Sequence, residues 1–198
     1  MAMVVVALGV AVEAGTSVVS FDRGANRAVH AHAAEPVTGS AFVLSALGST
    51  FVLVGVVLAA SLGLAVRGRR RASVALISAY VVTDATVALM KVLVARPRPG
   101  ESLTHAGGFS FPSGHAATSM AVYGSLAFVF ARARRGLPRV AFALAGGALV
   151  TLIGLSRIYL GVHYPSDVVA GWITGAAITI AAWTIASRLR PRRAPAPA

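Results

Sequence analysis

The sequence predicts an all-α integral membrane protein, a bundle of six transmembrane helices. Of its 198 residues, 57% are hydrophobic and the mean hydropathy is +0.77, which is more apolar than a soluble domain of this length. Six stretches approach the roughly 20 apolar residues that span a bilayer, and none alternates like a membrane β-strand. The predicted spans are residues 3–19, 41–66, 72–95, 115–131, 140–156 and 168–187.

The first span is the weakest of the six. It is short, contains Glu13 and lacks a basic flank, so a cleaved signal peptide is the alternative, with Val12 and Ala14 suiting a small-residue cleavage site. The missing basic n-region favours a true span. Residues 20–40 then form an external connection, part of it an amphipathic helix, without evident chemistry. Residues 1–190 form one domain, and residues 191–198 form a disordered cytoplasmic tail.

Arginine clusters follow alternate spans and orient the bundle. The chain has 18 Lys and Arg against 6 Asp and Glu. Positive loops lie on the cytoplasmic side, so we expect these three loops and both termini inside the cell. The split into three loops, without interleaved aromatic residues, argues against nucleic-acid binding, and the absence of cysteine excludes disulfides. The clusters are Arg67, Arg69, Arg70 and Arg71; Arg132, Arg134, Arg135 and Arg139; and Arg188, Arg190, Arg192 and Arg193.

Three polar segments fall on the opposite, external face, because the chain crosses the membrane twice between His115 and Ser156. Their residue types suit a phosphate group. Arginine presents a planar fork that matches two phosphate oxygens, and a glycine at a helix start exposes backbone N–H groups to an anion. The segments are residues 91–99, 109–115 and 156–167, and the candidate anion-binding residues are Lys91, Arg98, Ser113, Gly114 and Arg157.

Two histidines and one carboxylate complete this polar set. His115 and His163 can titrate near neutral pH. Asp167 lies four residues after His163, and Pro165 favours a helix start between them. This spacing lets the carboxylate orient the imidazole and stabilise its cation. The same three side chains are an alternative zinc site, although the surrounding cations would repel a divalent metal.

The polar residues form three motifs in a fixed order. They are Lys91-x6-Arg98-Pro99, Pro112-Ser113-Gly114-His115 and Ser156-Arg157-x5-His163-x3-Asp167. In order and spacing they resemble the three signatures of the type 2 phosphatidic acid phosphatase superfamily, which also includes vanadium haloperoxidases and glucose-6-phosphatase. The motifs cover residues 91–167, and the six-span layout covers nearly the whole chain. The neighbouring Arg96-Pro97 does not fit the first motif, because its six-residue spacing selects Arg98.

The resemblance implies a mechanism that needs no metal ion or other cofactor. His163 would attack phosphorus and become phosphohistidine, with Asp167 holding its ring. His115 would act first as general acid and then as general base. The resemblance assigns the equatorial phosphate oxygens to Lys91, Arg98, Ser113, Gly114 and Arg157.

The predicted function is therefore hydrolysis of a lipid phosphate in the plasma membrane, at a site that faces the extracytoplasmic side. Undecaprenyl pyrophosphate is the expected substrate, and phosphatidylglycerophosphate and phosphatidate are the alternatives. Undecaprenyl pyrophosphate carries two phosphates, which would suit five cationic groups: Lys91, Arg96, Arg98, Arg157 and a protonated histidine. A vanadate-dependent haloperoxidase and a lipid-phosphate transporter or sensor are less favoured, since haloperoxidases are large and soluble and a transporter would not need the full triad. The sequence defines no oligomeric state.

Three further polar residues lie outside the motifs. Asp84 lies two helical turns before Lys91 on the same helix face, and an acid within a span usually faces the bundle interior. We therefore expect Asp84 to make a structural hydrogen bond. Glu101 and His105 lie in the loop over the proposed site, where exposure to solvent is expected and contact with substrate is the alternative.

Overall fold

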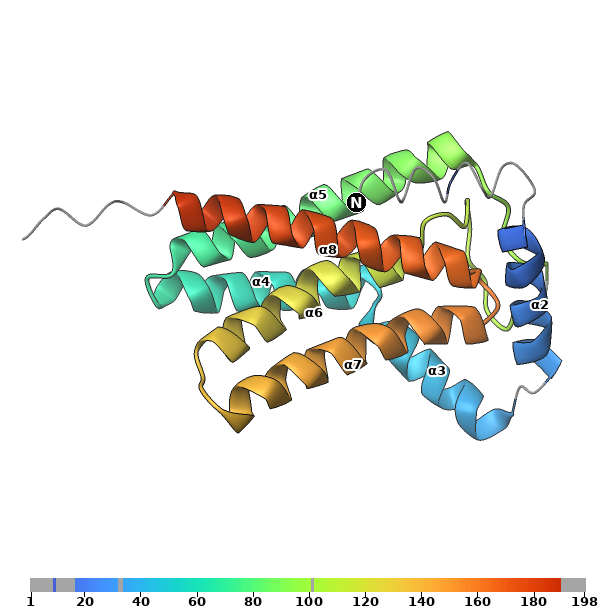
Figure 1. The fold of residues 1–198 in the computed structure, drawn as a ribbon, viewed down its shortest axis with the longest axis horizontal. Coiled ribbons are helices and arrows are strands. Elements are labelled where there is room, and N and C mark those ends of the chain that lie inside the picture. Colours follow the sequence, from blue (N-terminus) through green and yellow to red (C-terminus); the bar gives the residue numbers. More distant parts are fainter. Residues whose placement is uncertain (1–8, 10–16, 32–33, 101, 190–198) are drawn as a thin grey trace, which may run out of the picture.

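A computed structural model describes residue 9 and residues 17–31, 34–100 and 102–189, which contain helices and no strand. Helices α4 to α8 run along the long axis of the molecule, and α2 lies across one end of the bundle (Figure 1). The helices are α2 (Ser17–Ala31), α3 (Glu35–Leu47), α4 (Thr50–Val66), α5 (Arg70–Val94), α6 (Gly114–Arg132), α7 (Leu137–Tyr159) and α8 (Pro165–Arg188). The all-helical fold class is confirmed for the described residues.

The prediction of six spans is confirmed only in part. The four predicted spans from residue 72 onward correspond to α5, α6, α7 and α8. By length and composition α5, α7 and α8 are able to cross a membrane, and the bent pair α3–α4 would make a fourth span. The predicted span 3–19 and the tail 191–198 lie largely or wholly outside the described residues.

Helix α6 lies inside the bundle, surrounded by other helices. It packs against α4, α5, α7 and α8, so its polar side chains meet other helices rather than lipid. Small residues fill the resulting contacts: Ala116, Ala117 and Ala121 are fully buried. Large apolar side chains instead occupy the outer faces, where Phe51 on α4 is 92% exposed. A lipid environment permits large apolar side chains on the outer faces of the helices and small residues in the interior.

The predicted continuous span 41–66 is wrong in one respect, because it is broken at Gly48 and Ser49. Helices α3 and α4 meet there at an angle of 47°. A Cβ atom on Gly48 would lie 2.6 Å from Cγ2 of Ile153, so only glycine allows this close approach to α7. The bend directs α3 along α7 and, as described below, places Ser45 beside Arg157.

Asp84 does not face the bundle interior as expected. It is exposed on α5, whose buried side carries Ala79, Tyr80, Thr83 and Val87. Because each helical residue turns the side chain by about 100°, the residue after Thr83 points outward. The expected interior hydrogen bond of Asp84 is therefore not present.

Candidate active site

The three predicted polar segments meet at one end of the bundle, the end that α2 covers (Figure 1). The C-terminal ends of α5 and α7 meet the N-terminal ends of α6 and α8 there, joined by the loops 95–113 and 160–164. His115 lies within electrostatic range of Lys91, Arg98, Arg157 and His163. The structure thus gathers both predicted histidines and all three predicted cations.

His163 and Asp167 form the centre of the site. Nδ1 of His163 lies 3.4 Å from Oδ2 of Asp167, slightly beyond hydrogen-bond length. The predicted helix start is confirmed, since α8 begins at Pro165 and puts Asp167 in its first turn. Oδ2 of Asp167 also accepts the backbone N–H of Tyr164 at 2.9 Å. The carboxylate is therefore held on the Nδ1 side of the ring, which leaves Nε2 for chemistry.

Arg98 faces the other nitrogen of the same ring. Its Nη1 lies 3.3 Å from Nε2 of His163 and donates to the carbonyl of Val162 at 2.7 Å. Its remaining nitrogens donate to the carbonyls of Gly107 and Gly108, at 2.9 and 3.0 Å. These bonds fix a guanidinium at the place where a phosphoryl group bonded to Nε2 would carry its charge. Lys91 donates to the carbonyl of Phe109 in the same loop.

The segment Ser113-Gly114-His115 forms the start of α6. Ser113 is the N-cap, and its Oγ accepts the backbone N–H of Ala116 at 3.5 Å. The Ser113 backbone N–H donates to the carbonyl of Asp167 at 2.9 Å, which ties the starts of α6 and α8 together. Gly114 opens the helix and is partly exposed. The free N–H groups of this first turn favour an anion beside His115.

Arg157 is buried at the end of α7, and one of its buried nitrogens lacks a hydrogen-bond partner among the described residues. Its Nη1 donates to Oγ of Ser45 on α3. Its Nε is buried and has no hydrogen-bond partner among the described residues. A buried charged donor without a partner is costly, and a phosphate oxygen would supply the missing acceptor. Ser45 carries no motif signal and was missed by sequence reasoning.

Arg96 does not serve the phosphate as expected. Ala95 caps the C-terminus of α5 in the left-handed conformation (φ 46°), which costs a residue with a Cβ roughly 1–2 kcal/mol. Beyond this turn Arg96 is buried, and its Nη1 donates to Oδ1 of Asp167 at 2.6 Å. The guanidinium also stacks on Tyr164, 4.0 Å from the ring centroid. Arg96 thus pairs with Oδ1 of Asp167, whereas His163 faces Oδ2. The prediction that Arg96 helps to bind a second phosphate is wrong.

Helix α2, where no chemistry was expected, completes this support. Asp22 is fully buried, and its Oδ2 lies 2.8 Å from Nη2 of Arg96. Its other oxygen accepts the backbone N–H of Ser166 at 3.0 Å, and the Ser166 hydroxyl donates to the same carboxylate. One turn later, Asn26 donates to the carbonyl of His163 at 3.3 Å. The only sequence signal for these residues is that two polar side chains four apart share one face of an amphipathic helix.

Burial controls the electrostatics of His163. It lowers the pKa of His163 to about 4, and the charges of Arg98 and Lys91 act in the same direction, while Asp167 raises it. Burial likewise lowers the pKa of Arg98. The imidazole is therefore neutral at pH 7, as a nucleophile must be. His105 is exposed and Glu101 lies outside the described residues. No group of three His, Asp or Glu side chains within residues 17–31, 34–100 and 102–189 is placed to hold a metal ion.

Residues 72–191 match the model of the PAP2 superfamily. Among curated proteins, the chain is 35% identical to phosphatidylglycerophosphatase B of Bacillus subtilis over 91 residues, which is 44% of each chain. It is 33% identical to undecaprenyl-diphosphatase BcrC of the same organism over 109 residues, 52% of each chain. The chain thus spans about half the length of these relatives.

A solved structure shares the fold over nearly the whole chain. It is the crystal structure of a transmembrane PAP2-type phosphatidylglycerolphosphate phosphatase from Bacillus subtilis, with a TM-score of 0.86. The alignment covers 96% of both chains at 23% sequence identity. This similarity supports the arrangement of the helices, including those that precede the family match.

Proposed function

Because the chain belongs to the PAP2 superfamily, we propose that it is a membrane lipid phosphatase that works through a phosphohistidine on His163. The observation that supports this most directly is the surroundings of one imidazole. Nδ1 faces Asp167 at 3.4 Å and Nε2 faces Arg98 at 3.3 Å. A ring that faces a carboxylate on one side and a guanidinium on the other suits attack on a phosphoryl group.

The reaction has two steps. The lone pair on Nε2 of His163 attacks the terminal phosphorus, the bond from that phosphorus to the leaving oxygen breaks, and His115 donates a proton to that oxygen. In a lipid monophosphate the leaving oxygen belongs to the lipid alcohol, and in a diphosphate it belongs to the lipid monophosphate that is released. Water then attacks the phosphohistidine while His115 takes up a proton, and inorganic phosphate leaves. Lys91, Arg98 and Arg157 offset the charge on the phosphoryl oxygens in both steps. The first step needs a protonated His115. The negative charge of the bound substrate favours that protonated form, because it offsets the nearby cations.

For the substrate we propose a polyprenyl diphosphate such as undecaprenyl pyrophosphate, with the active site on the extracytoplasmic side of the plasma membrane. The site lies at the ends of apolar helices, so a lipid can reach it with its tail still in the bilayer. Similarity to the undecaprenyl-diphosphatase supports this choice. Since Arg96 is occupied by Asp22 and Asp167, the count of cations no longer favours two phosphates over one. Similarity to phosphatidylglycerophosphatase B therefore makes phosphatidylglycerophosphate the second candidate.

The phosphoenzyme is the first thing to test. Purified protein incubated with radiolabelled phosphatidate in detergent and quenched in alkali, which preserves phosphohistidine, should carry label that acid removes. His163→Ala should carry none and should release no phosphate, because it lacks the attacking nitrogen. A His163→Ala variant that still turns over would overturn the mechanism.

Phosphate release across a panel of lipids tests the substrate. Undecaprenyl pyrophosphate should give the highest kcat/KM, above phosphatidylglycerophosphate, phosphatidate and p-nitrophenyl phosphate. Equal efficiency on soluble phosphomonoesters would contradict a lipid substrate. Activity should survive EDTA, and a loss that a divalent ion restores would instead favour the zinc alternative.

A further inference from the structure

Two carboxylates and one guanidinium lie buried directly behind the nucleophile. Asp22 and Asp167 are both fully buried, and Arg96 is 6% exposed. Arg96 contacts Asp22 at 2.8 Å and Asp167 at 2.6 Å, so its single charge is shared between two anions. With His163 neutral, the formal charge of this cluster is one negative unit. A net charge at such depth is unfavourable unless another group offsets it.

The reaction itself supplies the offsetting charge. When Nε2 bonds to phosphorus while Nδ1 keeps its proton, the imidazole ring becomes cationic, and the cluster with this ring is then neutral. Without the Asp22 carboxylate, Arg96 would pair with Asp167 alone, and the same step would leave an extra buried positive charge.

On these grounds, which rest on the proposed phosphohistidine mechanism, we propose that Asp22 is a positioning residue for catalysis. Through Arg96 it keeps Asp167 free to stabilise the cationic ring of His163. It also holds the start of α8, since it accepts the N–H of Ser166, the residue before Asp167. Helix α2 is therefore part of the catalytic apparatus, although no part of it touches the phosphate.

Neutralising Asp22 should lower kcat and leave KM nearly unchanged. In Asp22→Asn we expect kcat for phosphatidate in detergent micelles to fall roughly 10- to 100-fold, the usual effect of removing a supporting partner. The amount of phosphoenzyme trapped by the quench should fall with it. Arg23→Gln is the matched control, because Arg23 lies next to Asp22 on the exposed face of α2. Wild-type kcat in a folded Asp22→Asn variant would overturn the proposal.

A double-mutant cycle separates this charge effect from a loss of structure. Arg96→Gln leaves two buried carboxylates unpaired, whereas Asp22→Asn with Arg96→Gln leaves Asp167 as the single anion facing His163. We expect the double variant to be more active than Arg96→Gln alone. A double variant that is equally or less active than Arg96→Gln would overturn the proposal. If Asp22→Asn alone does not fold, the comparison of these two variants still tests the role of Asp22. Absence of label in the wild-type enzyme would instead refute the phosphohistidine mechanism.

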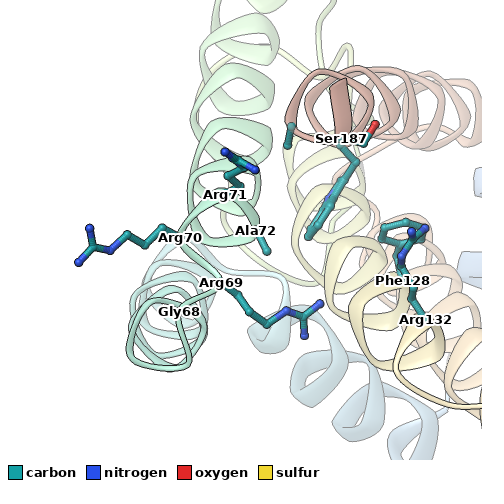
Figure 2. A pocket seen from close by; sticks show the side chains of 10 residues that line it. Gly68, Arg69, Arg70, Arg71, Ala72, Phe128, Arg132 and Ser187 are labelled. Carbon is teal, nitrogen blue, oxygen red and sulfur yellow. The ribbon is translucent and has the colours of Figure 1, made fainter. Parts of the chain in front are cut away.

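A separate observation concerns the opposite end of the bundle, about 30 Å away along α8. A cavity of about 630 Å³ lies there between the α4–α5 loop and the ends of α6 and α8. Figure 2 shows Arg69 extending toward the helix that carries Arg132 and Phe128. The ten lining residues include four arginines, and no carboxylate. The four are Arg69, Arg70, Arg71 and Arg132.

The walls of this cavity are held in place. Trp183 donates to Oγ of Ser125 at 2.9 Å and packs edge-on against Phe128, 5.2 Å between centroids. Arg132 lies 6.0 Å from the Phe128 ring centroid. Loop charges alone would explain arginines at this end, but not a cavity that has Arg69 and Arg132 in its lining beside an aromatic wall. Arg70 points away from that wall (Figure 2). Arg134 and Arg135, in the next loop, are exposed and do not line it.

The geometry points to a binding site for the phosphate headgroup of an anionic phospholipid from the adjacent leaflet. Basic pockets between transmembrane helices on the cytoplasmic side bind such headgroups, and the volume is typical of a ligand site. The aromatic and alanine side chains would contact the glycerol and the first part of the acyl chains. An inorganic anion would use the arginines alone.

Thermal unfolding in detergent tests this site. Phosphatidylglycerol should raise the Tm, while phosphatidylcholine and inorganic phosphate should not. The Arg69→Gln/Arg132→Gln variant should lose this increase, and the matched Arg134→Gln/Arg135→Gln variant should keep it. An equal increase with inorganic phosphate would indicate an anion site that does not recognise lipid. An undiminished lipid effect in Arg69→Gln/Arg132→Gln would overturn the proposal, and would place the lipid elsewhere.

Discussion

At the scale of single residues, burial sets the protonation state of the proposed nucleophile. His163 is 2% exposed, and its pKa is lowered to about 4 mainly by that burial. The ring is therefore unprotonated over the whole neutral range. Arg98 and Lys91, which we propose bind the phosphate, also lower the pKa of His163 and so keep its ring unprotonated until substrate arrives.

This burial should appear in the pH dependence of stability. Between pH 6.5 and 4 the unfolded chain protonates His163 while the folded protein does not, so the contribution to stability is complete above pH 6.5 and falls as pH falls toward 4. His163→Gln cannot titrate, and its Tm should decline less than that of the wild type across this window. Parallel Tm curves for the two proteins would show that the ring is not buried in its neutral form.

The role of His115 depends on the leaving group. His115→Ala should lower kcat/KM by roughly 100- to 10,000-fold for phosphatidate, whose poor alkoxide leaving group needs a proton. For p-nitrophenyl phosphate the loss should be much smaller, since nitrophenolate leaves without protonation. Steady-state kinetics with both substrates measures the difference. Equal losses on the two would rule out general-acid catalysis by this residue.

At the scale of helices, the site depends on how closely α8 approaches α6. Gly171 and Gly175 lie one turn apart on α8, and a Cβ on them would come within 2.6 Å of the Ser113 carbonyl oxygen and 2.3 Å of the Ala117 carbonyl oxygen. Small residues four apart allow such close helix packing in membranes. This contact brings the start of α6, with Ser113 and Gly114, beside Asp167.

Gly175→Ala should therefore disturb the protein, although alanine favours helices. The added methyl group meets backbone rather than a movable side chain, so we expect a destabilisation of about 1–3 kcal/mol and a lower kcat as α6 moves away. Gly55→Ala is the control, because a Cβ at this α4 position meets nothing within 4 Å. It should leave the Tm unchanged or raise it slightly. Similar thermal melts for the two variants would contradict the close packing.

At the scale of the whole molecule, the active site and the main arginine clusters lie at opposite ends of the same helices. The site lies at the start of α8, whereas Arg69, Arg70 and Arg132 lie near its end. If positive loops face the cytoplasm, the phosphatase chemistry takes place on the outer side of the membrane.

Single cysteines test this orientation, and the chain has none to remove. Ser102 and Ala133 are exposed in loops at opposite ends of the bundle, whereas the nearby Ser110 is fully buried and unsuitable. On intact cells an impermeant thiol reagent should label Ser102→Cys and not Ala133→Cys. Both should react after the membrane is permeabilised. The reverse pattern on intact cells would invert the proposed topology.

The sequence by itself determined what depends on local composition and spacing. Hydropathy located α5 to α8 within a few residues, and the Pro165 start placed Asp167 one turn beyond His163. The spacing of the three motifs selected Arg98 rather than Arg96 for the first signature, and the structure puts Arg98 against the nucleophile. These features are readable because each depends on residues close together along the chain.

Only the tertiary structure decided how distant residues share charge and space. Asp22 and Ser166 are 144 positions apart, and nothing local to either indicates that they are hydrogen-bonded. The same holds for the bend at Gly48, which depends on Ile153, and for α6, whose polarity is tolerated because other helices surround it. Arg96 illustrates the difference best. Its sequence context allowed a phosphate ligand, but two buried carboxylates from different helices hold it behind the nucleophile, because a buried guanidinium is stable only where its charge is matched.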